Sequence, residues 1–296
     1  MSLVALRHRN FRLLWLGLFA SYAGTLMQTA VILWHVSLLV APAHRALALG
    51  GVGLVRVVPI VVFSMISGVA ADVLDRRRVM LVTQSGMAVL AAVLAAVSWH
   101  GLHALWVVYL LAAVTSAIGA FDLPARQALL PNLVPREHLP NALSLNTIVF
   151  QIAAVVGPAA GGLVIAALGV AWAYAITALS FAVVIVGLLM MRDVRAKPEP
   201  HPSTAGQRGF SVHAAMEGLR FVFRAPLIRS TMLLDFFATF FSSATALLPI
   251  YAQSILRVGA SGYGWLYAAP AVGAILASAV MVRAVDVIER RGTVLS

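Results

Sequence analysis

Long apolar runs separated by short polar segments dominate the chain. A helix that crosses a membrane needs about 20 mostly apolar residues, and runs of that length recur along most of the sequence. The pattern predicts eight spanning helices, at residues 12–39, 46–70, 79–98, 104–122, 142–168, 170–191, 228–253 and 262–284. The chain is therefore expected to be an all-α integral membrane protein.

The composition supports lipid as the solvent of this chain. Hydrophobic residues make up 61% of it and charged residues only 10%, whereas soluble domains carry about 25% charged residues. Cysteine is absent, which excludes disulfides and Cys-ligated metal sites. The sequence also has no phosphate-binding glycine loop, no nucleophile motif and no cluster of ligating side chains, so we expect no cofactor, no metal and no enzymatic activity.

The basic residues are distributed unevenly between the two sides of the predicted bundle. With the N-terminus in the cytoplasm, 18 of the 21 Lys and Arg residues fall on the cytoplasmic side, Arg45 and Arg257 fall outside, and Arg56 lies within the second span. This distribution obeys the positive-inside rule. The net charge of +11 is therefore explained by membrane topology, and we expect lipid contacts and no binding of nucleic acid.

The longest polar stretch separates six predicted spans from two. It is rich in proline and basic residues, and it predicts a cytoplasmic linker with a short amphipathic helix at residues 212–223 lying on the membrane surface. The predicted divisions are an N-terminal six-helix bundle at residues 1–191, the linker at 192–226, and the start of a second bundle at 227–296.

A short acidic and basic motif occurs twice, at an offset of 214 residues. Ala71–Arg78 is repeated as Val285–Gly292, so that Asp72 matches Asp286 and Asp75 matches Glu289. Both copies follow a long apolar run. Such a repeat is typical of membrane transporters built from two similar halves. Six spans precede the linker and two follow it, so we expect four further spans after Ser296 in a complete protein.

These features resemble the major facilitator superfamily. The resemblance extends to the bacterial branch that contains the enterobactin exporter, through the segments at residues 121–142, 157–162, 247–252 and 264–270. It implies a helical bundle with a complete first half, the first two helices of a second half, and solute export driven by an ion gradient. The implied location is the bacterial inner membrane, crossed several times.

The repeated motif resembles the loop that latches the two halves of these transporters in one access state. A glycine at position 68 is expected to let neighbouring helices approach closely. The alternative is a short cytoplasmic loop that merely obeys the charge bias. The residues implied in the gating loop are Gly68, Asp72, Asp75, Arg76, Arg77, Asp286, Glu289 and Arg290.

The fifth span contains a motif that resembles the one associated with antiporters, formed by Gly157, Pro158, Gly161 and Gly162. Proline removes a backbone hydrogen bond and should bend the helix. The glycines leave a flat face against which another helix can slide. Ordinary helix packing is the alternative, because glycine and proline are common in spanning helices.

Two charges stand out inside predicted spans, where charges are costly and often functional. Asp235, in the seventh span, is a candidate site for a proton or a substrate cation; alternatively it stays hydrated and pairs with Arg229. Arg56, in the second span, is a candidate functional charge; alternatively it is a structural anchor.

Polar residues recur at helical spacing in the first span, namely Ser21, Thr25, Gln28 and His35, and the fourth span offers Tyr109 and Ser116. The resemblance implies that the first, fourth and seventh spans line a central cavity. Thr25, Gln28, Tyr109 and Ser116 are therefore substrate candidates, beside Asp235 and Arg56. Hydrogen bonding between helices is the alternative for each of them.

The sequence as a whole favours a secondary active transporter. We expect a proton-coupled exporter of a small organic molecule, siderophore-like or drug-like, that works by alternating access. The alternative is a membrane protein that does not transport, either a truncated remnant or an assembly partner.

Overall fold

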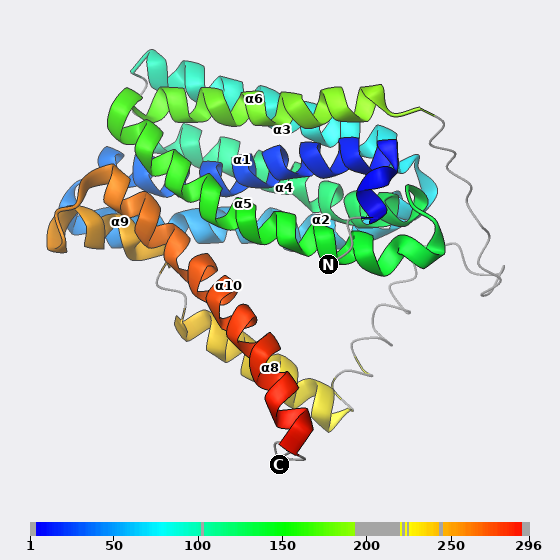
Figure 1. The fold of residues 1–296 in the computed structure, drawn as a ribbon. Helices are drawn as coiled ribbons and strands as arrows, with labels where there is room; N and C mark the ends of the chain where they lie inside the picture. The colour runs from blue at the N-terminus through cyan, green and yellow to red at the C-terminus, as the bar shows by residue number, and fades with distance from the viewer. Residues whose placement is uncertain are drawn as a thin grey trace. The chain divides into compact units, whose positions relative to one another are not determined.

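Six long helices make up the first part of the protein (Figure 1). The structure is a computed structural model and describes residues 4–101, 104–192, 220, 223, 225–242 and 245–291. The six helices are α1 (Arg9–Leu39), α2 (Arg45–Val73), α3 (Arg76–Trp99), α4 (Leu105–Leu129), α5 (Leu139–Leu168) and α6 (Val170–Met190). Each is long and apolar enough to cross a membrane, which confirms the first six predicted spans.

The helix ends follow from local sequence. Asp75 caps α3, where its carboxylate accepts hydrogen bonds from the backbone nitrogens of Arg77 and Arg78 at 2.9 and 3.2 Å. Gly169 joins α5 to α6 with a φ of +90°, a conformation that favours glycine. Short 3₁₀ turns complete the connections, at Val4–Arg7, Pro42–His44, Leu130–Asn132 and Arg136–His138.

Helix α4 extends further than the sequence predicts. The predicted span ends at residue 122, but the helix continues through Pro124 to Leu129. The prediction stopped there because an acidic residue, a proline and an arginine follow in quick succession. The helix accommodates them because Pro124 sacrifices only one backbone hydrogen bond, and because the two charged side chains pair with each other, as described below.

The second part of the described chain is less regular. The predicted span at 228–253 is not one continuous helix: it contains α8 (Pro226–Ser242), a 3₁₀ turn (Thr245–Leu247), α9 (Leu248–Ile250) and a π-helical turn (Tyr251–Ile255). Pro249 is in the first turn of α9, where its missing N–H costs no helical hydrogen bond. Helix α10 (Gly259–Arg291) is longer than the predicted span at 262–284.

The chain divides into two compact units. One comprises Met1–Arg195 with Leu247–Ser296 and holds α1–α6, α9 and α10; the other comprises Ala196–Ala246 and holds α8. The predicted amphipathic helix at 212–223 lies almost wholly outside the described residues.

In the larger unit, α1 packs along α5 and α6, α3 along α4 and α6, α2 along α4, and α10 along α5 (Figure 1). Tyr263 of α10 is fully buried and donates a hydrogen bond to the carbonyl of Ala30 in α1 at 2.8 Å. Many large apolar side chains point outward, among them Val61, Leu179 and Leu189. Such a surface is expected where lipid is the solvent.

Candidate functional site

A cavity of about 440 Å³ lies inside the larger unit, enclosed by α1, α2, α3, α4 and α6. Its wall combines polar and apolar side chains. It brings together four of the six predicted substrate or ion residues, Thr25, Gln28, Arg56 and Ser116. The remaining lining residues are Ile60, Ser64, Ser67, Gly68, Met87, Thr115, Gly119, Ala120, Leu123, Pro124, Gln127 and Phe181.

The α1 side of the cavity carries the predicted polar stripe. The hydroxyl of Thr25 donates to the carbonyl of Ser21 at 2.8 Å, within the helix. Gln28 is only 3% exposed, and its amide nitrogen has no hydrogen-bond partner among the described residues. A buried amide without a partner is costly, so this nitrogen is free for a ligand.

Arg56 supplies the only charge among the described lining residues. No carboxylate pairs with it in the described part of the chain. The phenol of Tyr267 in α10 lies within electrostatic range of its guanidinium. The alternative that Arg56 is a structural anchor stays a prediction.

A buried ion pair that the sequence analysis did not single out lies close to this cavity, on α4. Asp122 and Arg126 are each 5% exposed, and Arg126 Nη2 lies 2.5 Å from Asp122 Oδ2. Gln84 Nε2 and the Thr83 hydroxyl donate to Asp122 Oδ1 at 2.8 and 2.9 Å. The neighbouring helix α3 thus satisfies the carboxylate from the other side.

The guanidinium of Arg126 also reaches α1. Its Nη2 donates to the hydroxyl of Ser21 at 3.0 Å, and its carbon lies 4.3 Å from the centre of the Tyr22 ring. Ser21 in turn donates to Gln84 Oε1 at 3.1 Å. The ion pair therefore joins α1, α3 and α4 through one polar network, and Ser21 belongs to this network rather than to the cavity wall.

The first copy of the repeated loop is partly described. Arg77 donates from Nε to the carbonyl of Leu188 at 2.8 Å and from Nη2 to that of Leu189 at 3.2 Å, so it caps the end of α6. Arg76 begins α3. Gly68 lines the cavity, and a Cβ there would meet no atom within 4 Å, so the expected close approach is not seen at this glycine. The side chains of Asp72, Asp286, Glu289 and Arg290 lie outside the described residues.

The glycine motif of α5 faces two neighbouring helices. A Cβ at Gly157 would collide with the backbone of Ala23 in α1. A Cβ at Gly162 would lie 2.7 Å from the Cα of Gly264 in α10. Gly161 lies against the side chain of Met27 in α1, and the carbonyl oxygen of Pro158 lies against Gly264 of α10. The four residues of the motif thus form a close junction of α1, α5 and α10.

The two other candidates, Tyr109 and Asp235, are not among the lining residues of this cavity. The Tyr109 hydroxyl donates to the carbonyl of Ala48 at 2.6 Å, which ties α4 to α2. Asp235 is an exposed residue of α8, in the smaller unit. It does not pair with Arg229, although both side chains are described.

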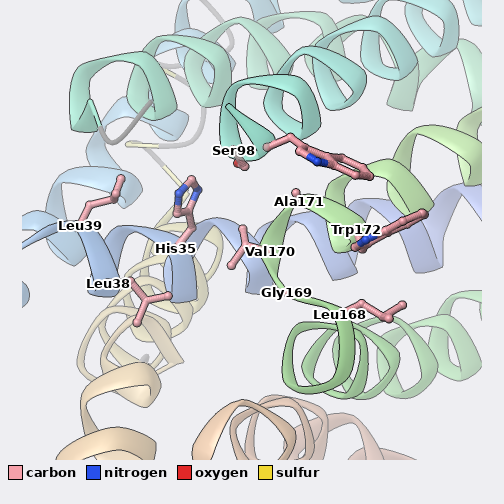
Figure 2. A pocket seen from close by; sticks show the side chains of 10 residues that line it. His35, Leu38, Leu39, Ser98, Leu168, Gly169, Val170, Ala171 and Trp172 are labelled. Atoms are coloured by element: carbon pink, nitrogen blue, oxygen red, sulfur yellow. The ribbon is translucent and has the colours of Figure 1, made fainter. Parts of the chain in front are cut away.

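A second cavity, of about 510 Å³, lies at the ends of α1, α3, α5 and α6. Figure 2 shows His35, Ser98 and Trp172 around it. The ring nitrogen Nδ1 of His35 lies 3.2 Å from the buried hydroxyl of Tyr174, and the rings of Trp99 and Trp172 are 5.1 Å apart. Its lining contains one titratable side chain, His35, among the described residues.

Comparison with known proteins agrees with this architecture. The family model described as transmembrane secretion effector matches residues 1–295. The MFS-type transporter YfiS of Bacillus subtilis, which is uncharacterized, is 30% identical over 176 residues, which is 59% of this chain and 40% of that protein. The enterobactin exporter EntS of Shigella boydii is 29% identical over 214 residues, covering 72% and 49%.

The EntS protein of Escherichia coli O1:K1 is 28% identical over the same length. The chain thus spans about half the length, or less, of the curated relatives that it matches. The family model nevertheless covers nearly the whole chain. With the membrane-length helices and the internal cavity already established, this match settles its classification. The chain is a multi-pass membrane protein and belongs to the major facilitator superfamily, in its transmembrane secretion effector family.

Proposed function

We propose that this chain serves secondary active transport, exporting a small organic molecule of siderophore or drug type by alternating access. The observation that carries the proposal is the cavity of about 440 Å³ inside a bundle of membrane-length helices, whose wall is largely apolar and carries a few polar side chains and one charge. Its size falls within the range of small-molecule sites, and polar groups inside a membrane protein mark solute pathways. The relatives named as enterobactin exporters support export as the direction.

We further propose that a proton is the exchanged ion and that Asp235 binds it. Asp235 is an acidic residue within a predicted span, and ionisable side chains in spanning segments often belong to ion pathways. We propose two moving parts for alternating access. The two copies of the repeated loop hold the halves of the transporter together in one access state, and neighbouring helices slide against the glycine motif of α5 when that state changes.

The proposed location is a bacterial inner membrane, with the N-terminus in the cytoplasm and lipid around the bundle. In this proposal residues 1–191 form the first half-bundle, 192–226 the linker and 227–296 the beginning of the second half. Exposed tryptophans support a membrane interface at one end of the bundle: Trp99, Trp106 and Trp172 stand at the predicted outer ends of α3, α4 and α6, and aromatic belts occur at membrane interfaces.

Everted membrane vesicles test the proposal. Vesicles that contain the protein are energised by respiration, and the uptake of two xanthene dyes, anionic fluorescein and cationic tetramethylrhodamine methyl ester, is followed by fluorescence. Export corresponds to uptake into everted vesicles. We expect uptake of at least one dye above that of vesicles without the protein, and loss of this uptake when a protonophore collapses the gradient.

Two results would contradict parts of the proposal. Uptake that survives the protonophore contradicts proton coupling and leaves export standing. Absence of uptake, with the protein shown by immunoblot to be inserted, contradicts export and favours the alternative of a membrane protein without transport activity.

A further inference from the structure

We infer that the cavity among α1, α2 and α4 binds organic anions, with Arg56 holding the negative group and the Gln28 amide donating a second hydrogen bond to it. This inference names the substrate class and so rests on the proposed export function. It depends on the charge of the wall, on an amide donor without a partner, and on the shape and polarity of the space that these groups face.

The charge of the cavity wall is positive. Arg56 lines it from the middle of α2, and no acidic residue occurs among the described lining residues. The nearest acid on α4, Asp122, is already neutralised by Arg126 and accepts hydrogen bonds from α3. An arginine without a carboxylate partner in a membrane interior is unfavourable, so an anionic ligand would supply the missing counter-charge.

Gln28 adds a second, independent observation. The residue lines the same cavity, is 3% exposed, and leaves its amide nitrogen without a partner among the described residues. The nearby hydroxyl of Thr25 donates to the backbone carbonyl of Ser21 and is not a partner of the Gln28 amide nitrogen. A buried donor and a guanidinium without a carboxylate partner among the described residues line the same cavity, which suits an oxyanion, since an oxyanion can accept hydrogen bonds from both kinds of group.

The rest of the wall explains why the ligand would be organic. Ile60, Met87, Leu123 and Phe181 contribute apolar surface to the cavity, and such surface gains nothing from a hydrated inorganic ion. The volume of about 440 Å³ falls within the range of small-molecule sites. The geometry therefore points to a carboxylate or phenolate attached to an apolar, aromatic-sized body.

Binding of two dyes to the purified full chain in detergent tests the inference. The probes are fluorescein and tetramethylrhodamine methyl ester, which share a ring skeleton and differ in charge, and binding is measured by fluorescence anisotropy. We expect fluorescein to bind at least tenfold more tightly than the cationic dye. Arg56→Gln should weaken fluorescein binding about tenfold, because a hydrogen bond to a charged group is lost, whereas Arg56→Lys should retain most of the affinity.

Matched variants separate the cavity charge from the net charge. Arg45→Gln removes the same charge from the first residue of the same helix, outside the cavity, and should leave binding unchanged. Gln28→Glu places a negative charge beside Arg56 and should remove the preference for fluorescein. Equal or tighter binding of the cationic dye to the unmodified protein, or an equal loss in Arg45→Gln and Arg56→Gln, would overturn the inference.

The transport assay distinguishes failure of this inference from failure of the proposed function. Vesicles that accumulate the cationic dye but not fluorescein would leave export standing and overturn anion selectivity. Protein that binds fluorescein with the expected dependence on Arg56, but accumulates neither dye in vesicles, would uphold the anion site and overturn export.

Discussion

Asp122 and Arg126 show how two charges become compatible with a membrane interior. They are one helical turn apart, so they pair within α4. Side chains of α3 donate to Asp122 Oδ1, and the Ser21 hydroxyl of α1 accepts from Arg126 Nη2. Two of the guanidinium nitrogens, Nε and Nη1, have no partner among the described residues. Breaking a buried pair by removing one partner costs about 3–5 kcal/mol, because the other charge is left uncompensated.

We therefore expect Asp122→Asn to destabilise the protein by several kcal/mol, on the order of that penalty. Asparagine keeps an oxygen that can accept from Gln84 and Thr83, so the change removes the negative charge and the acceptor that faces Arg126 while the bonds to α3 can persist. Thermal unfolding of the purified protein in detergent measures the effect. The double variant Asp122→Asn/Arg126→Gln should recover part of the loss, and Asp75→Asn, at an exposed helix cap, serves as the control. An Asp122→Asn variant as stable as this control would contradict the argument.

Asp235 is the residue on which proton coupling is proposed. Replacing it with asparagine removes the titratable group and keeps the size of the side chain. We expect Asp235→Asn to abolish dye uptake that depends on the proton gradient, while the level of inserted protein stays unchanged. Uptake that retains its full sensitivity to a protonophore in this variant would remove Asp235 from the mechanism.

The sequence predicted part of the cavity and missed the polar network beside it. Thr25, Gln28 and Ser116 were found because their helical spacing shows which face they share. The ion pair of Asp122 and Arg126 was missed because the sequence around Pro124 resembles a helix end, so that Asp122 stood at the end of the predicted span and Arg126 was assigned to the cytoplasmic side. The signal was present in their spacing of four residues, which allows an ion pair within a helix, but one sequence does not reveal that α3 and α1 provide partners.

At the scale of helices, glycine determines how closely α5 and α10 approach. In a membrane the hydrophobic effect does not drive helices together, so close packing at small residues carries much of the association. Gly264 of α10 faces Gly162 and the Pro158 carbonyl, whereas a Cβ at Gly273 of the same helix would meet no atom within 4 Å. The two glycines therefore offer a matched comparison.

We expect Gly264→Ala to destabilise the protein by about 1–3 kcal/mol, because the new methyl group would lie 2.7 Å from the Pro158 carbonyl oxygen and force the helices apart. Gly273→Ala should be neutral or stabilising, since alanine favours a helix by about 1 kcal/mol over glycine. Thermal unfolding of both variants in the same detergent measures the difference. Equal melting temperatures would show that this junction does not hold α10 in place.

The pattern of helices was more predictable than their ends. Apolar length identified the first six spans, because a membrane imposes a minimum length that few other segments meet. It did not predict the break within 228–253, where Pro249 starts a new helical segment although the apolar run continues. Hydropathy indicates whether a segment favours lipid or water as its surroundings. It carries no information about where the backbone hydrogen bonds of a helix are interrupted.

At the scale of the whole molecule, the charge pattern predicts the membrane topology, that is, the side of the membrane on which each loop lies. The two ends of α2 offer a direct comparison, because Ala43 precedes this helix and Leu74 follows it, and both are exposed. The absence of cysteine means that any introduced thiol is the only one in the chain. A membrane-impermeant maleimide then reports the side of each position without a background signal.

The positive-inside rule places Ala43 outside and Leu74 in the cytoplasm, since three consecutive arginines closely follow Leu74. In intact cells we expect the maleimide to label Ala43→Cys fully and Leu74→Cys only after the membrane is permeabilised. The opposite pattern would invert the bundle and contradict the proposed cytoplasmic N-terminus. Labelling of both positions in intact cells would contradict a span between them, although α2 is long and apolar enough to form one.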